Sequence, residues 1–260
     1  MNHVALQNVL DSPGSSETSH LIIVVDPHPT IRGRCTKSIA SLYVFQLLWN
    51  RHTTGRASEM VNLYYLFQSV GFTGSAAGWA FESLMHHSLR KGLTIQLSSI
   101  QSHSTKDNIH YDNYTASISG TNPWMFQLPV SDEHDLQEGA KLVVGHYYRP
   151  QSSNFPTIDS LFLIRPSRWS FPVLLMFWIA QNRDGCDVNT VTLERVAGLQ
   201  LPRGTQKYYV VVTPEDIKPD IRVPKAYFTD RELRKKKLDK IFPVFHFRVV
   251  VESVLPPGAE

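Results

Sequence analysis

One aspartate interrupts an otherwise apolar stretch of this 260-residue chain. Asp159 is the only charged residue in the run over residues 154–164, and a second apolar run covers residues 171–181. Both runs are short, contain proline near one end, and are rich in residues that suit a buried strand. A carboxylate at the mouth of a buried strand is costly unless it is paired, solvated or bound to a metal. Asp159 is therefore the first candidate for a functional site.

The chemistry that Asp159 could serve is metal-dependent cleavage of a phosphodiester. Glu82 lies in a predicted helix over residues 76–91. If the helix acid and the strand acid converge, their carboxylate oxygens can hold Mg²⁺. Such an ion polarises a phosphodiester and helps to activate water. The alternative is that Asp159 is a strand-edge acid whose oxygens accept hydrogen bonds from backbone donors.

The strand that follows Asp159 lacks the polar pair that this chemistry needs. In the usual nuclease arrangement, that strand adds a second acid and a lysine, two residues apart on one face. Here the best-placed pair is Trp178 and Ala180, which neither bind a metal nor orient a water. Gln181 has a usable oxygen, but it belongs to the opposite face of a regular strand. It enters the site only if the strand carries a bulge.

Histidine and basic residues give two further candidate sites. Glu82 and His86 stand at i and i+4 on one helix face and could form a metal pair, with a polar helix face as the alternative. A predicted helix over residues 230–240 could contact phosphates or act as a nuclear import signal, and a solvated helix face is the alternative. Its four consecutive basic residues are Arg234, Lys235, Lys236 and Lys237. Four other histidines are scattered and suggest no shared site: His110, His134, His146 and His246.

The composition is that of an ordinary globular protein, with 42% hydrophobic and 19% charged residues. The formal net charge of +3 is compatible with nucleic-acid binding but is not evidence for it. Cys35 and Cys186 are too few for a disulfide framework. No signal peptide and no apolar run of roughly 20 residues is visible, so we expect an intracellular protein, cytoplasmic or nuclear, without a membrane partner. No GxxxxGK[ST] motif is present, so this chain alone is not expected to bind a nucleotide cofactor through a P-loop.

The predicted elements indicate a mixed sheet with helices packed on it. Strands are predicted over residues 20–26, 94–100, 141–148, 154–164, 173–181, 207–213 and 241–254, and helices over 37–51, 58–69, 76–91, 189–200 and 230–240. Residues 101–135 are polar and turn-rich, with strand character only over 124–130. Residues 1–57 resemble the end of another domain, and residues 58–260 an α/β domain.

Four segments resemble, in order, the C-terminal nuclease-like module of Crinkler-type effectors and of the related retrotransposon hot spot proteins. They are AGWAFESLMHHSLRKG, YYRPQSSNFPTIDSLFLI, VLLMFWIAQ and KYYVVVTP. Proteins of this kind typically join a P-loop ATPase region to a restriction-endonuclease-like domain. The resemblance covers about residues 69–214. More faintly, residues 20–51 resemble the tail of the ATPase region without its Walker motifs.

The resemblance implies a restriction-endonuclease-like fold of the PD-(D/E)XK class, with Mg²⁺ as cofactor. It places Glu82 on the family's helix acid and Asp159 on its strand metal acid. Trp178 falls where the family has an acid or glutamine, and Ala180 where it has lysine or threonine. The chain thus resembles a divergent, degenerate DNA nuclease of an effector. The alternatives are a non-catalytic module that binds nucleic acid or a protein partner, and a truncated gene fragment.

Overall fold

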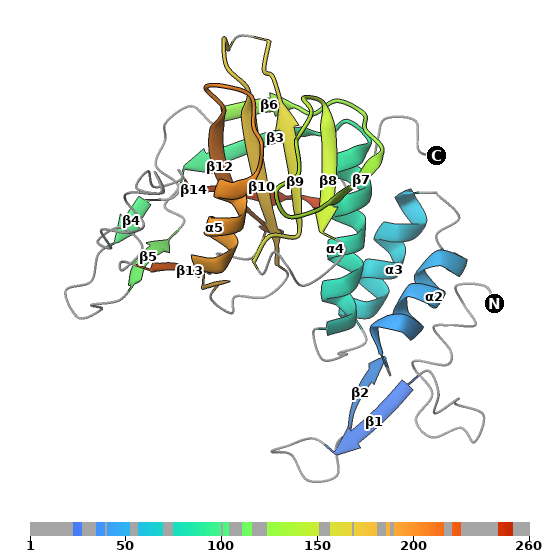
Figure 1. The fold of residues 1–260 in the computed structure, drawn as a ribbon. Coiled ribbons are helices and arrows are strands. Elements are labelled where there is room, and N and C mark those ends of the chain that lie inside the picture. The colour runs from blue at the N-terminus through green and yellow to red at the C-terminus, as the bar shows by residue number, and fades with distance from the viewer. Residues whose placement is uncertain are drawn as a thin grey trace. The chain divides into compact units, whose positions relative to one another are not determined.

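The computed structural model describes residues 23–27, 35–39, 41–52, 57–69, 75–99, 101–103, 111–115, 124–150, 157–167, 169–180, 186–187, 190–215, 220–224 and 244–251. Within these residues the chain is a mixed α/β protein, as predicted (Figure 1). It forms two compact units, of residues 1–85 with 251–260 and of residues 86–250. The boundary falls within helix α4 (Ser75–Arg90). The division between residues 57 and 58 stays a prediction.

Aromatic packing holds the first unit together. Phe45 of α2 (Leu42–His52) is buried, and its ring lies 5.9 Å from that of Phe67 on α3 (Ala57–Ser69). Trp79, on α4, lies 5.6 Å from the same Phe45 ring. The helices predicted over residues 58–69 and 76–91 are confirmed.

A hairpin of β1 (Ile23–Pro27) and β2 (Cys35–Ile39) precedes α2. The strand predicted over residues 20–26 is confirmed as β1, but the helix predicted from residue 37 begins at residue 42. Ser41 explains the later start, because its hydroxyl accepts the N–H of Val44 at 3.2 Å and so caps the helix. The residues before it pair with β1 instead.

The second unit is built on an eight-stranded mixed sheet with the order β6-β3-β14-β12-β10-β9-β8-β7. β10 runs antiparallel to β9 and parallel to β12. The strands are β3 (Thr94–Ser99), β6 (Trp124–Gln127), β7 (Glu133–Leu136), β8 (His146–Pro150), β9 (Ser160–Ile164), β10 (Val173–Ile179), β12 (Gln206–Pro214) and β14 (Val244–Val249). The predicted mixed sheet flanked by helices is thus present.

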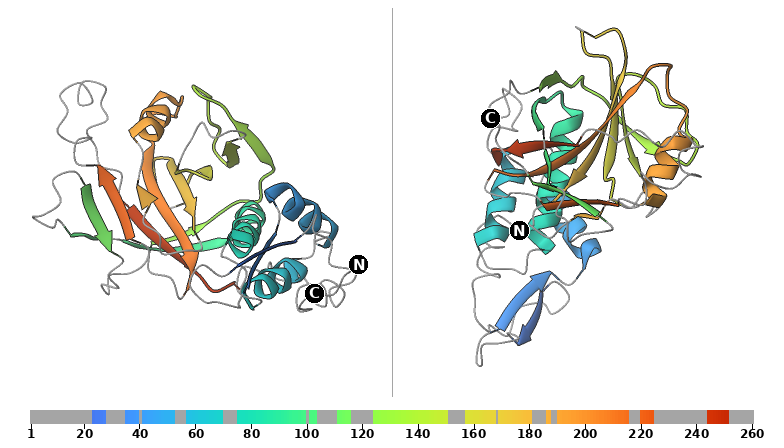
Figure 2. Two further views of the ribbon diagram at one scale, coloured as in Figure 1. Left: turned by 90° about the horizontal axis from the view of Figure 1, so that it is seen from below. Right: turned by 90° about the vertical axis from the view of Figure 1, so that its left-hand side faces the viewer.

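Helix α5 (Thr190–Gly198) covers one face of the central strands (Figures 1 and 2). Directly opposed residues across the central strands share a face, so the row Tyr148, Leu161, Met176 and Tyr209 lies on the α5 side. The buried residues of this side form the α5-face cluster: Leu136, Leu142, Tyr148, Ile158, Leu161, Leu163, Leu174, Met176, Val196, Leu199, Tyr209 and Val211. The neighbouring row on the opposite face contains Tyr147, Phe162, Leu175 and Tyr208.

Two parts of the second unit differ from the predicted elements. Residues 101–135 contribute β4 (Gln101–His103) and β5 (Tyr111–Thr115) to a four-stranded sheet with β11 (Cys186–Asp187) and β13 (Asp220–Pro224). β8 begins at His146 instead of residue 141, because Gly145 takes a φ of 89° and its N–H donates to Leu163 O at 2.6 Å. The predicted helix over residues 230–240 lies outside the described residues. Among the helices that are described, none has both the length and the apolar character needed to cross a membrane.

Candidate functional site

The carboxylate of Asp159 binds the backbone of the neighbouring strand. Asp159 is half-buried immediately before β9, and its N–H donates to Phe177 O at 2.8 Å. Its Oδ2 accepts the N–H of Ile179, the last residue of β10, at 2.6 Å. This charge-assisted hydrogen bond satisfies the N–H of Ile179, which lies beyond the last residue of β10 that pairs with β9. This is the backbone role that the sequence offered as the alternative to metal binding.

An irregularity at Asp159 and Ser160 makes this contact possible. Ile158 and Leu161 both belong to the α5-face cluster although they stand three residues apart, whereas a regular strand would place them on opposite faces. Phe177 is paired with Ser160 and also accepts the N–H of Asp159. Two residues of one strand therefore face a single residue of the other, as in a β-bulge.

Backbone strain marks the entry to this bulge. Among the described residues, Thr157 is the one non-glycine residue with a positive φ, at 68°. A β-branched residue rarely adopts this conformation, which costs about 1–3 kcal/mol. The carbonyl of Thr157 accepts the hydroxyl of Tyr209 at 2.6 Å, so the turn is held from β12. The strained turn directs the chain into the position that Asp159 occupies.

The β10 positions that should carry the polar pair are apolar and remain in register. β10 pairs regularly with β12 through Ile179, so the bulge that Gln181 would need does not occur over residues 173–179. Trp178 is half-buried and packs against the α5-face cluster. The N–H of Ala180 continues the pairing by donating to Val212 O at 2.9 Å. Gln181 itself lies outside the described residues.

The described residues do not fit the Mg²⁺ site that the resemblance implies. Magnesium is bound in proteins through carboxylates and further oxygen ligands. Asp159 has one oxygen engaged by Ile179, and the β10 positions add no donor. Glu82 is half-buried on α4. Within the described part of the chain, no three His, Cys, Asp or Glu residues gather as a metal site. The basic run Arg234, Lys235, Lys236 and Lys237 lies outside that part.

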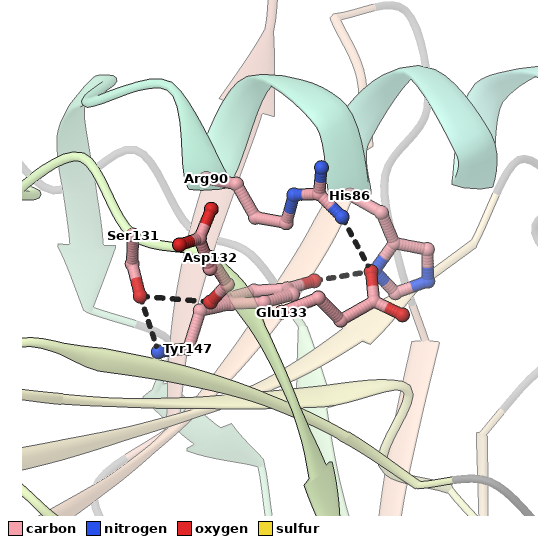
Figure 3. A network of polar contacts seen from close by, with 6 residues as sticks. All are labelled: His86, Arg90, Ser131, Asp132, Glu133 and Tyr147. Carbon is pink, nitrogen blue, oxygen red and sulfur yellow. Dashed lines mark hydrogen bonds and ion pairs between the residues drawn. The ribbon is translucent and has the colours of Figure 1, made fainter.

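A polar network surrounds Tyr147 in the second unit (Figure 3). The Tyr147 hydroxyl and His86 Nδ1 are 2.5 Å apart, and both side chains are buried. Burial raises the pKa of Tyr147 well above its usual value, and the nearby Ser160 hydroxyl and Arg149 charge only partly oppose that rise. The phenol therefore keeps its proton at neutral pH.

The same network fastens the last turn of α4 to β7 and β8. Arg90 forms an ion pair with Glu133 at 2.8 Å, and its carbonyl accepts the N–H of Ser131 at 2.9 Å. The Ser131 hydroxyl accepts the N–H of Tyr147 at 3.0 Å and donates to the carbonyl of Asp132 at 2.9 Å (Figure 3). The ion pair is about one-third exposed on each side and contributes little by itself. The buried bond from Tyr147 to His86 is the strong element.

Two further histidine contacts had no signal in the sequence. The rings of His134 and His146, on the adjacent strands β7 and β8, are stacked with centroids 4.3 Å apart. His246 is buried on β14, and its Nε2 lies 2.8 Å from the Thr213 hydroxyl. Because that hydroxyl donates to the carbonyl of Pro214 at 3.0 Å, it accepts a proton from Nε2. Strand register brings these groups together, and spacing along the chain does not reveal it.

His246 should make the protein sensitive to acid. Burial, aided by the charge of Arg248, lowers the pKa of His246 from 6.5 to about 4. Between these values the unfolded chain binds a proton at His246 that the folded protein does not, so stability falls as pH falls through this window. We expect His246 to account for a loss of about 2 kcal/mol between pH 7 and pH 5.

Urea denaturation of the wild type and of His246→Gln at both pH values measures this loss. Glutamine can donate to Thr213 but does not titrate, so the variant should lose about 2 kcal/mol less than the wild type on acidification. His87, whose pKa is lowered by burial and by the charges of Lys91 and Arg90, is present in both proteins. Equal losses in the two proteins would contradict the assignment to His246.

Comparison with protein-family models, with curated proteins and with solved structures gives no match for this chain. The resemblance to the Crinkler and retrotransposon hot spot module therefore stays a prediction.

Proposed function

We propose that this chain is a restriction-endonuclease-like domain that no longer cleaves phosphodiesters and acts as a non-catalytic module that binds nucleic acid. The hydrogen bond from the N–H of Ile179 to Asp159 Oδ2 is the observation that carries the proposal. This bond gives Asp159, the predicted metal ligand, a structural role. The apolar Trp178 and Ala180 on the next strand support the loss of cleavage.

The order of elements supports the nuclease-like part of the proposal. Helix α4 is followed, after an insertion, by β8, by β9 just beyond Asp159, by β10 with Trp178, by α5 and by the parallel strand β12. This is the order in which the resemblance places its helix acid, its metal acid and its polar pair. The strained Thr157 beside Asp159 supports descent from a functional site, because such strain clusters at active sites.

Three forms of the protein separate the structural role of Asp159 from a catalytic one. Asp159→Asn retains an oxygen that can accept the N–H of Ile179, whereas Asp159→Ala leaves that buried donor without its partner. We expect the alanine variant to lose about 2 kcal/mol in the free energy of unfolding and the asparagine variant clearly less. Urea denaturation followed by tryptophan fluorescence measures both.

The same three proteins test the loss of cleavage. Each is incubated with supercoiled plasmid in Mg²⁺ and, separately, in Mn²⁺, with EDTA as control. We expect no metal-dependent nicking by any of them, because Asp159 is engaged and the polar pair is missing. The proposal is wrong if the wild type nicks the plasmid and the folded Asp159→Asn protein does not. That outcome would instead assign an active Mg²⁺-dependent nuclease.

A further inference from the structure

An aromatic surface lies at the end of the sheet where β10 begins. Trp124, on the edge strand β6, is 41% exposed, and its neighbour Met125 is 67% exposed. The ring of Trp169, in the loop between β9 and β10, meets that of Trp124 edge to face at 5.0 Å. Phe171 in the same loop lies 5.2 Å from Trp169. We name this set, with Arg165 and Arg203, the aromatic end surface.

A buried floor holds these side chains in place. The rings of Tyr208 and Phe245, both buried, lie 5.8 and 5.7 Å from the ring of Trp124. Tyr208 also contacts Trp169 at 6.1 Å. The N–H of Trp169 donates to Pro166 O at 3.0 Å, which closes the loop into a turn. The exposed tryptophan is therefore presented by a rigid base.

Two exposed arginines lie in the loops at this end of the sheet. Arg165 directly precedes the turn from Pro166 to Trp169, and Arg203 lies in the loop between α5 and β12. The two loops adjoin, because the N–H of Gln206 donates to Pro172 O at 2.9 Å. The sequence places no acidic residue in residues 165–172 or 202–206. These loops therefore bring positive charge, and no acid of their own, to the end of the sheet that exposes Trp124.

This surface is far from Asp159 along the sheet. Trp169 lies before the first residue of β10, whereas Asp159 binds Ile179 at the last. The seven residues of β10 span about 20 Å. Whatever binds at the aromatic end surface does so independently of the Asp159 position.

We propose that the aromatic end surface binds single-stranded nucleic acid. Unpaired bases expose faces that stack on aromatic side chains, whereas the bases of a duplex are already stacked on each other. Guanidinium groups beside the rings pair with the phosphates that follow each base. Stacking accepts any base, so the surface selects single strands with little sequence preference. This proposal rests on the proposed nucleic-acid binding and specifies that the bound form is single-stranded. It does not depend on the loss of cleavage.

Fluorescence anisotropy with the full chain tests this site. The probe is a labelled oligothymidine of about 20 nucleotides, used in EDTA so that cleavage plays no part. We expect saturable binding that quenches tryptophan fluorescence and is at least about tenfold tighter than binding to a duplex of equal length. The binding assay tests the aromatic end surface, and the plasmid assay tests the loss of cleavage. A negative result in one assay does not change the outcome of the other, so the two proposals can fail separately.

Charge reversal locates the site without disturbing the buried floor. Arg165→Glu and Arg203→Glu should each weaken binding about tenfold. Lys141→Glu changes the net charge equally at an exposed position before β8 and should leave binding within about twofold. Trp124→Ala, if folded, should abolish part of the quenching. The proposal is overturned if the oligonucleotide does not bind or if the duplex binds equally well. It is also overturned if Arg165→Glu and Lys141→Glu weaken binding equally, because that result would indicate general electrostatic attraction.

Discussion

Trp178→Glu combined with Ala180→Lys should lower the free energy of unfolding by about 4 kcal/mol and should not produce cleavage. The two changes install the acid and lysine that the resemblance expects on β10. Trp178 packs against the α5-face cluster, so its removal leaves a void among Leu, Val and Ile side chains. A glutamate there would also lose much of its hydration without gaining a cationic partner from the cluster.

Urea denaturation and the plasmid assay together check this double variant. Ala180→Lys alone serves as the control for the added charge and should cost much less than the pair. Trp178→Leu keeps an apolar side chain against the cluster and should fall between the wild type and the double variant. A double variant as stable as the wild type, with Mg²⁺-dependent nicking, would show that the site needs only its polar pair to work.

Tyr147→Ala should cost about 4 kcal/mol, and Tyr147→Phe about 2 kcal/mol. The alanine variant removes a fully buried ring that meets Phe162 edge to face at 5.6 Å. The phenylalanine variant keeps that packing and removes only the hydroxyl, so the buried hydrogen bond to His86 Nδ1 is lost. The difference between the two variants separates packing from hydrogen bonding.

Tyr148→Phe is the matched control for this measurement. Its hydroxyl accepts the N–H of Val143 at 2.8 Å in a partly buried setting on the other face of the sheet. Removing it should cost about 1 kcal/mol, because water can replace the lost acceptor more readily. Urea denaturation of all four proteins measures the set. Equal costs for Tyr147→Phe and Tyr148→Phe would mean that the bond to His86 carries no special weight.

The apolar elements of the fold could be predicted because their signal is local. β9, β10 and β12 are runs of buried residues bounded by turns, and α4 shows a clear apolar stripe that stops before Gly92, with its φ of 91°. The small sheet could not be predicted, because β5 is polar and its partner β13 lies far along the chain. The N-capping residue Ser41 is a local signal for the start of α2. The apolar pattern that begins at Ile39 instead favoured an earlier start.

The candidate site could be predicted only in part. The sequence identified Asp159 as unusual and Trp178 and Ala180 as incompatible with metal chemistry, and the last two lie in regular, apolar surroundings. It could not choose between the two roles of Asp159, because the choice depends on a bulge that shifts the chain by one residue. The pairing of His86 with Tyr147 joins positions 61 residues apart, and no local pattern predicts such a contact.

The hydrogen bond of Asp159 also changes how an acid at this position is interpreted in other chains. A residue that closes the end of a strand contributes to folding whether or not the protein has any catalytic activity. Trp178 and Ala180 have different tasks, because Trp178 packs against the α5-face cluster and the N–H of Ala180 donates to Val212 O. An acid at the mouth of a buried strand is therefore no evidence of a metal site by itself, because its oxygens can serve the backbone of the neighbouring strand alone.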